Sequence, residues 1–279
     1  MESTSPLVDY EFRGYTPSLE HRFQISDDPI SQERYKFVTN IGEKLTSFPF
    51  YTGLTLIGSL SKGKALTPEN ASQTDMNMGV FLDFDGINRL TDLQLRWLSL
   101  KSGIPYQMDR SPVSVNDGKY NIFASQNLSP EELARIRLVR QVADKVIQKQ
   151  GEVFFNGGAA KPLAIWPEVA IYSQEGSFSI YSTLEQYEAS QDKPGEERIA
   201  VTRALALPFG MLVAGDLNPY LKAFFRKLKS LDPEMAEQKW QTVRKAIINN
   251  ERPGQVPTAI ESQFPKTVDE AQRIYVKDP

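Results

Sequence analysis

The sequence predicts an α+β fold in which helices flank a mixed β-sheet and a helical C-terminal domain follows. Strand-type and helix-type hydrophobic patterns alternate between residues 29 and 182. After residue 195, helix-type patterns are separated by proline and glycine. The 279 residues are 40% hydrophobic and 24% charged, which is typical of a globular protein. We therefore expect an N-terminal arm (1–28), a sheet domain (29–182) and a helical domain (195–279).

The sheet domain is expected to begin with a helix and a short strand. After Pro29, apolar residues recur at helical spacing: Tyr35, Phe37, Val38, Ile41 and Leu45. A β-type run at residues 54–57 follows. The helix would pack its apolar face on the sheet.

A turn with glycine at both ends follows this strand. It begins at Gly58-Ser59, and Gly63 comes four residues after the serine. Glycine lets the backbone approach a ligand closely, and exposed N–H groups beside a hydroxyl suit phosphate oxygens. Lys62 and Lys64 would add positive charge. The turn is thus a candidate phosphate site.

A second strand is expected at residues 74–83. Its period-two pattern places Asp75 and Asn77 on one face and Met76 with Met78 on the other. Two oxygen ligands on one strand face can share a hard divalent cation.

Together, Gly58-Ser59 and Asp75-Met76-Asn77 resemble the signature of the DNA polymerase β-like nucleotidyltransferase superfamily. That signature is Gly-Ser, a short variable stretch, and two carboxylates flanking one apolar residue on a strand. The resemblance is strong over about thirty residues and looser over residues 31–172. The alternative is a β-hairpin whose acids only cap strand ends. The departure from the family is Asn77, where the family has Asp or Glu.

The resemblance implies a nucleotidyltransferase-like palm at residues 29–182 that moves an NMP from an NTP to a hydroxyl acceptor. The acceptor would be an RNA end, a small molecule or a protein. Two Mg²⁺ (or Mn²⁺) ions would be held by Asp75, Asn77 and a third carboxylate on a neighbouring strand. Glu168 is the preferred third ligand and Glu152 the alternative.

The resemblance also assigns the nucleotide contacts. Gly58, Ser59 and Lys62 would hold the β- and γ-phosphates. Because Asn77 contributes no charge, metal binding should be weaker than with an aspartate there. A catalytically silent protein that binds a nucleotide or a partner is therefore the second hypothesis, and an α+β structural protein is the third.

The remaining patterns predict, in chain order, a turn at 83–86, a helix at 90–100, a hairpin turn at 116–118, a helix at 129–149, strands at 152–155 and 164–172, and helices at 196–207, 218–231, 233–250 and 268–275. In the last strand, Glu168, Ala170 and Tyr172 share one face. Lys222–Lys229 interleaves cations with aromatics, but it is better interpreted as an amphipathic helix with Leu221, Phe224, Phe225 and Leu228 buried.

Composition argues against several classes of protein. The absence of cysteine excludes disulfides and thiolate metal sites and favours a cytoplasmic location. No apolar run is long enough to span a bilayer, and the N-terminus lacks a secretory pattern. The net charge of −3 carries no DNA-specific signal. The single His21 gives no support to a histidine metal site. A triphosphate could contact Arg198 or Arg203, but a solvated helix face is the preferred interpretation for both.

Overall fold

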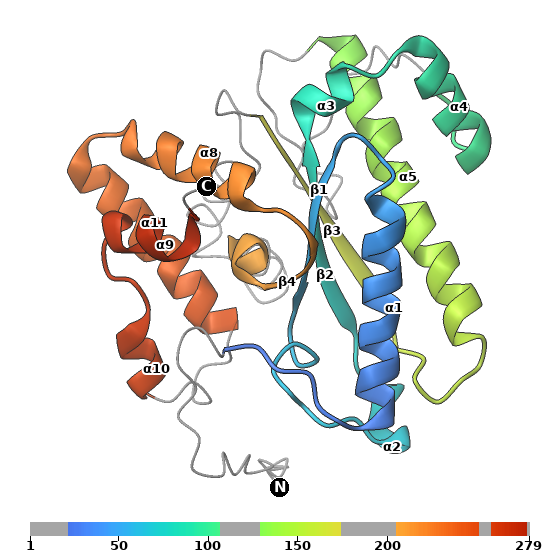
Figure 1. Ribbon diagram of the computed structural model, residues 1–279, viewed down its shortest axis with the longest axis horizontal. Helices are drawn as coiled ribbons and strands as arrows, with labels where there is room; N and C mark the ends of the chain where they lie inside the picture. Colours follow the sequence, from blue (N-terminus) through green and yellow to red (C-terminus); the bar gives the residue numbers. More distant parts are fainter. Residues whose placement is uncertain (1–21, 107–128, 174–204, 251–257, 278–279) are drawn as a thin grey trace, which may run out of the picture.

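A four-stranded mixed sheet with helices on either side forms the centre of the protein (Figure 1). The computed structural model describes residues 22–106, 129–173, 205–250 and 258–277. The strand order is β3-β2-β1-β4. The fold is α+β, as the alternating patterns predicted.

The central strands are antiparallel neighbours. β1 (Tyr51–Ile57) pairs with β2 (Met76–Asp83) on one side and with β4 (Met211–Gly215) on the other, both antiparallel. β3 (Ile165–Tyr172) runs parallel to β2. The sequence predicted β1, β2 and β3 but missed β4. This strand is a short edge strand and is only partly buried, so it carries little alternation.

One face of the sheet is covered by α1 (Pro29–Leu45) and α5 (Pro130–Phe155), which lie side by side (Figure 1). The core between them and the sheet includes Phe37, Val38, Ile41, Leu45, Leu54, Leu56, Met76, Met78, Val80, Leu82, Val139 and Ile171. Asp28 caps α1 by accepting the Ser31 N–H at 2.8 Å, and the Asp28 carboxylate also accepts the Leu66 N–H at 3.0 Å. The cap thus ties α1 to the chain that follows the glycine turn.

The predicted strand at residues 152–155 is wrong, because α5 continues to Phe155. Gly151 lies inside this helix, and a Cβ there would come within 2.3 Å of the Ile165 side chain. The glycine therefore permits close packing of α5 against β3 and does not end the helix. Phe155 packs on Phe37 with ring centroids 4.9 Å apart. The alternative third ligand, Glu152, lies exposed on a helix.

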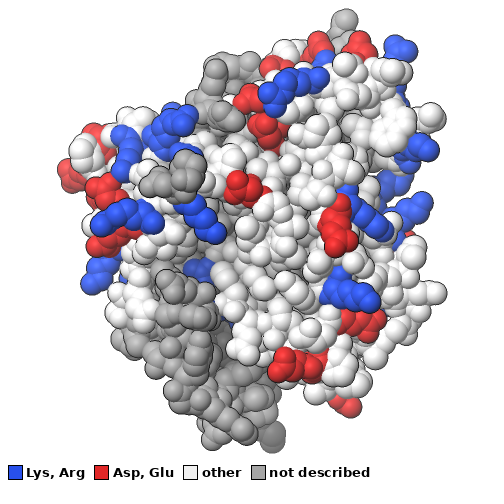
Figure 2. All heavy atoms as spheres, in the orientation of Figure 1, with Lys and Arg blue, Asp and Glu red and all other residues white. Residues whose placement is uncertain are grey.

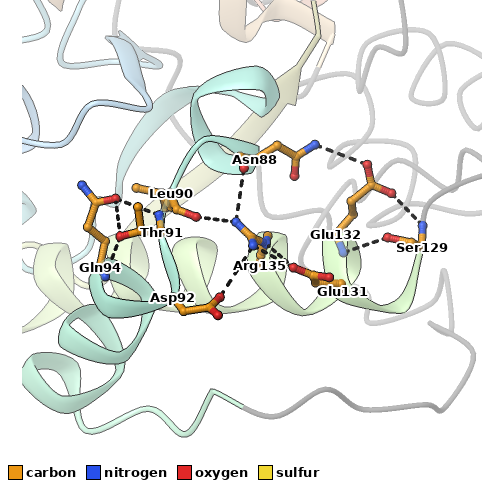
Figure 3. Close-up of polar contacts among 9 residues, drawn as sticks. All are labelled: Asn88, Leu90, Thr91, Asp92, Gln94, Ser129, Glu131, Glu132 and Arg135. Atoms are coloured by element: carbon orange, nitrogen blue, oxygen red, sulfur yellow. Dashed lines mark hydrogen bonds and ion pairs between the residues drawn. The ribbon is translucent and has the colours of Figure 1, made fainter.

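Short helices connect the main elements: α2 (Pro68–Ala71), α3 (Phe84–Asn88) and α4 (Asp92–Ser102). The predicted turn at 83–86 is the start of α3. Figure 3 shows how Arg135 of α5 holds the connection from α3 to α4. Its guanidinium donates to the carbonyls of Asn88 at 3.2 Å and Leu90 at 2.6 Å, and pairs with Glu131 at 2.7 Å.

The opposite face of the sheet packs against the C-terminal region, which contains η2 (Leu207–Phe209), α8 (Asn218–Lys229), α9 (Pro233–Asn250), α10 (Thr258–Gln263) and α11 (Val268–Tyr275). Phe81 of β2 and Tyr172 of β3 enter this second core. α8 buries Leu221, Phe224, Phe225 and Leu228, which confirms the amphipathic interpretation of Lys222–Lys229. α10 was not predicted.

Several predictions fall outside the described residues, namely those for 1–21 of the arm, His21, the hairpin turn at 116–118, most of the helix at 196–207, and Arg198 and Arg203. Within the ranges that the structure does describe, no helix combines the length and the apolar character that crossing a membrane requires.

Candidate functional site

The glycine turn is compact and left-handed at both of its glycines. Gly58 has φ of +85° and Gly63 of +71°, a region that favours glycine. The Ser59 carbonyl accepts the N–H groups of Lys62 and Lys64, each at 3.2 Å. The Ser61 hydroxyl donates to the Gly58 carbonyl at 2.9 Å. These bonds close residues 58–64 into one unit, called here the Gly-Ser turn.

The sheet brings the Gly-Ser turn next to Asn77. Ile57, the last residue of β1, is the register partner of Asn77 on β2. A Cβ added to Gly58 would lie 3.5 Å from the Asn77 Nδ2 atom. Two motifs that are nineteen positions apart (77 − 58) therefore meet at one end of the sheet. We call it the site end, where β1 ends and β2 begins.

Alternation along β2 is as predicted. Met76 and Met78 are buried in the core under α1 and α5, so Asn77 points to the other face, toward the C-terminal region. Asp75 lies one residue before the strand begins.

Asp75 and Asn77 share a property with a few other described residues, among them Asn88 and Gln272. The Oδ1 atoms of Asp75 and Asn77 are both buried and have no hydrogen-bond partner. Leaving a buried polar atom without a partner costs about 1–3 kcal/mol. Carboxylate and amide oxygens are ligands that hard divalent cations accept. By their chemistry these two oxygens are of the type that could bind Mg²⁺ or Mn²⁺, and Asp75 would supply the charge.

The connection that carries Asp75 is held by a buried arginine of α1 that sequence reasoning missed. Arg34 is only 1% exposed. Its guanidinium donates to the Ala71 carbonyl at 2.7 Å, the Thr74 hydroxyl at 2.7 Å and the Ala160 carbonyl at 2.8 Å. Nothing local in the sequence distinguishes Arg34 from a surface arginine on an amphipathic helix.

Arg34 carries its charge at neutral pH. Burial lowers the pKa of its guanidinium to about 10, and the charges of Asp28 and Asp75 oppose that lowering. The positive charge therefore lies within electrostatic reach of Asp75, although no direct ion pair joins the two.

The predicted third ligand, Glu168, lies half-buried on β3. Its register partner on β2 is Gly79, whereas Trp166 is opposite Asn77. Glu168 thus shares a face with Asn77 but is displaced by two residues along the strand. In the part of the chain that the structure describes, no three acidic or histidine side chains gather closely enough to hold a metal. The structure therefore does not bring Glu168 and Asp75 into a three-acid cluster.

A shallow surface depression adjoins the Gly-Ser turn on the C-terminal side of the sheet. Lys62 and Arg22 line it together with Phe23, Ile57, Ala206, Phe209, Gly210 and Ile247. The Arg22 guanidinium donates to the Phe209 carbonyl. The main chain of Gln24 joins the turn by donating to the Ser61 carbonyl at 2.9 Å. Arg22 thus adds a second cation beside Lys62, and its place in the arm gave no sequence signal.

Charges of both signs mix over the surface of the C-terminal helices. On the face in Figure 2, lysines and arginines of this region are interspersed with acids. Lys229 of α8, for example, pairs with Asp269 at 2.6 Å. On this face, acids therefore lie among the cations of the C-terminal helices.

No protein-family model, curated protein or solved structure matches this chain.

Proposed function

We propose that this chain is a metal-dependent nucleotidyltransferase that moves an NMP from an NTP to a hydroxyl acceptor. One observation carries the proposal: a left-handed Gly-Ser turn adjoins the Asn77 side chain, and the buried Oδ1 atoms of Asn77 and of Asp75, two residues before it, lack hydrogen-bond partners. The antiparallel pairing of β1 with β2 creates this arrangement, and the order of the two motifs is that of the polymerase β-like superfamily. The corresponding fold would be a nucleotidyltransferase palm with a helical C-terminal domain.

The residues would divide the task by their chemistry. The amides of the Gly-Ser turn and the Ser59 hydroxyl would hold the β- and γ-phosphates, with Lys62 as an added cation. Asp75 and Asn77 would hold Mg²⁺ or Mn²⁺, and Glu168 would assist from β3. The metal would neutralise charge on the attacking and leaving oxygens of the α-phosphate. Catalysis of this kind depends mostly on positioning and charge neutralisation.

A second function is favoured by the amide at position 77 and by the offset of Glu168 from it. With one formal charge fewer than two carboxylates would provide, the site would bind the metal more weakly. In this alternative, the protein binds a nucleotide or a partner at the Gly-Ser turn without turnover.

Three variants test the proposal with labelled NTPs, Mn²⁺ and total RNA as acceptor. The Asn77→Asp variant restores the missing charge, so we expect product at least about ten-fold faster than with the wild type. Adding Asp75→Ala to Asn77→Asp should abolish the product. The matched control is Asp83→Asn, at the far end of the same strand, which should leave the rate unchanged.

The outcomes separate the two functions. Asp75-dependent Mn²⁺ and NTP binding without product in any variant would favour the silent binding protein. Equal turnover by wild type and Asn77→Asp would contradict the assigned role of position 77. Isothermal titration that detects neither NTP nor Mn²⁺ binding would exclude both functions.

A further inference from the structure

Arg34 joins three separate stretches of backbone at the site end of the sheet. Its Nε atom donates to Ala160, which lies between α5 and β3. One terminal nitrogen donates to Ala71 at the end of α2, and the other donates to the Thr74 hydroxyl. We propose that Arg34 is the positioning residue of the metal site, which holds Asp75 in place through these backbone tethers.

The hydrogen bonds of Arg34 fix Thr74, the residue before Asp75. The Thr74 hydroxyl accepts from Arg34 at 2.7 Å and itself donates to the Ala71 carbonyl at 2.9 Å. The Thr74 carbonyl accepts the Leu163 N–H at 3.0 Å. Thr74 is thus bound on both its side chain and its main chain.

The residue after Asp75 is fixed as well. The Met76 N–H donates to the Ala164 carbonyl at 2.9 Å. Asp75 therefore lies between two anchored neighbours, while its own Oδ1 atom has no hydrogen-bond partner. The backbone on both sides of Asp75 is hydrogen-bonded, whereas its Oδ1 atom has no protein partner among the described residues.

Arginine suits this role because its donors are spread over a wide, planar fork. The planar guanidinium presents its N–H groups in a fixed fork, which here reaches acceptors on three segments. Lysine would keep the charge but would lose the fork. A buried charge is costly unless it is hydrogen-bonded, and at 1% exposure these bonds offset that cost.

The charge of Arg34 and its hydrogen-bond tether should affect metal affinity in opposite directions, so an experiment can separate the two effects. A cation near Asp75 repels a metal ion, so loss of the charge alone would strengthen metal binding. Loss of the tether would weaken it, because outer residues that orient metal ligands typically contribute about 10–100-fold in affinity. Arg34→Lys keeps the charge and removes the fork, and it therefore isolates the tether.

The inference rests on the proposed function, since it assumes that Asp75 binds a metal. The experiment measures Mn²⁺ affinity by electron paramagnetic resonance in the Asn77→Asp background, where binding should be tightest. We expect Arg34→Lys to weaken Mn²⁺ binding by about ten-fold or more. Thr74→Val, which keeps Arg34 and removes one acceptor, should weaken it by a smaller factor.

The matched control is Arg135→Lys. Arg135 of α5 also donates to two backbone carbonyls, those of Asn88 and Leu90, but these belong to the connection that follows the other end of β2. It should lower stability without changing Mn²⁺ affinity. A general loss of stability would instead weaken binding in both lysine variants.

Each result has one meaning. Mn²⁺ binding that Asp75→Ala abolishes, but that Arg34→Lys and Thr74→Val leave unchanged, would overturn the inference and leave the proposed function intact. Mn²⁺ binding that is absent or insensitive to Asp75→Ala would overturn both. If Arg34→Lys fails to fold, Thr74→Val decides, because an unchanged affinity in that variant contradicts the tether.

Discussion

The two ends of β2 carry aspartates in opposite states. At the site end, the Oδ1 atoms of Asp75 and Asn77 are buried and have no hydrogen-bond partner. At the other end, which we call the cap end, both oxygens of Asp83 are engaged: they accept the N–H groups of Asp85 and Gly86, each at 3.1 Å. Asp83 also lies 3.6 Å from Arg89.

The difference teaches what distinguishes a structural acid from a candidate ligand. Asp83 stabilises the start of α3, so its local hydrogen bonds account for its presence. No bond that the structure contains accounts for the buried oxygen of Asp75. A buried polar atom that destabilises the fold because it lacks a hydrogen bond is typical of functional sites.

The cap end also contains a tyrosine surrounded by acids. Burial raises the pKa of Tyr172 to about 12, while the Thr52 hydrogen bond lowers it and the charges of Asp83, Asp216 and Asp85 raise it further. The phenol therefore stays protonated at neutral pH. At the cap end, the Tyr172 hydroxyl and both Asp83 oxygens therefore have hydrogen-bond partners, unlike the Oδ1 atoms at the site end.

The largest expected effect concerns metal binding. At a Mn²⁺ concentration about 100-fold above Kd, the free energy of unfolding should rise by about 2.7 kcal/mol. Asp75→Ala should remove this gain, and Asp83→Ala should retain it. Thermal melts with and without Mn²⁺ provide the measurement. A gain that survives Asp75→Ala would place the metal elsewhere.

The next effect tests the Gly-Ser turn. Gly58→Ala should cost about 1–2 kcal/mol, because alanine is strained at φ of +85°. Gly157→Ala is the matched control, since Gly157 has φ of +79° and nothing within 4 Å of an added Cβ. Both should lower stability in urea, but only Gly58→Ala should weaken NTP binding. Equal NTP affinity in the two variants would show that the Gly-Ser turn does not contact the NTP.

A smaller effect compares the two aspartates in the absence of metal. Asp83→Ala removes the cap of α3 and should cost about 1 kcal/mol. Asp75→Ala removes a buried oxygen that has no partner and also a charge that favours the buried Arg34 guanidinium, so these effects oppose each other and the loss should be smaller than for Asp83→Ala. Urea denaturation of both variants measures this. A larger loss of stability for Asp75→Ala than for Asp83→Ala would show that Asp75, and not Asp83, is the structural acid.

The smallest effect is a pH dependence at the cap end. Burial and the charge of Asp85 raise the pKa of Asp83 above its ordinary 3.8, against the hydrogen bonds from Asp85 and Gly86 and the charge of Arg89. The folded state thus holds the proton more tightly than the unfolded state. This contribution to stability is present below pH 3.8 and is lost as the pH rises through the raised pKa.

Asp83→Asn serves as the comparison, because asparagine also caps helices but does not titrate. The stability of the wild type relative to this variant should fall as the pH increases from 3.5 to 6.5, by less than the cap itself contributes. Unfolding curves across that range measure the slope. A flat difference would show that Asp83 does not change its protonation on folding.

Much of the fold could be predicted from local patterns. The alternation in Met76–Asp83 correctly sent Met76 and Met78 to the core and Asn77 to the opposite face. The Ser129-Pro130 start of α5 was recognisable because a capping box is a short-range feature, and the structure contains that box. These features depend on neighbours within a few residues.

Other features depend on segments far apart in the chain. Gly151 resembled a helix end, but it is a contact point for Ile165 of β3. β4 forms only because β1 offers it a free edge, and its own five residues carry little strand signal. Lys62 was identified as a cation by type, whereas its neighbour Arg22 became visible only through the surface depression.

The sequence by itself determined the two motifs, their order, and the face on which Asn77 lies, because turn chemistry and strand alternation are local properties. The tertiary structure decided that the Gly-Ser turn meets Asn77, that Glu168 is offset from it, and that Arg34 tethers the connection before Asp75. Register and burial arise from packing between distant segments, so they leave no fixed spacing in the chain.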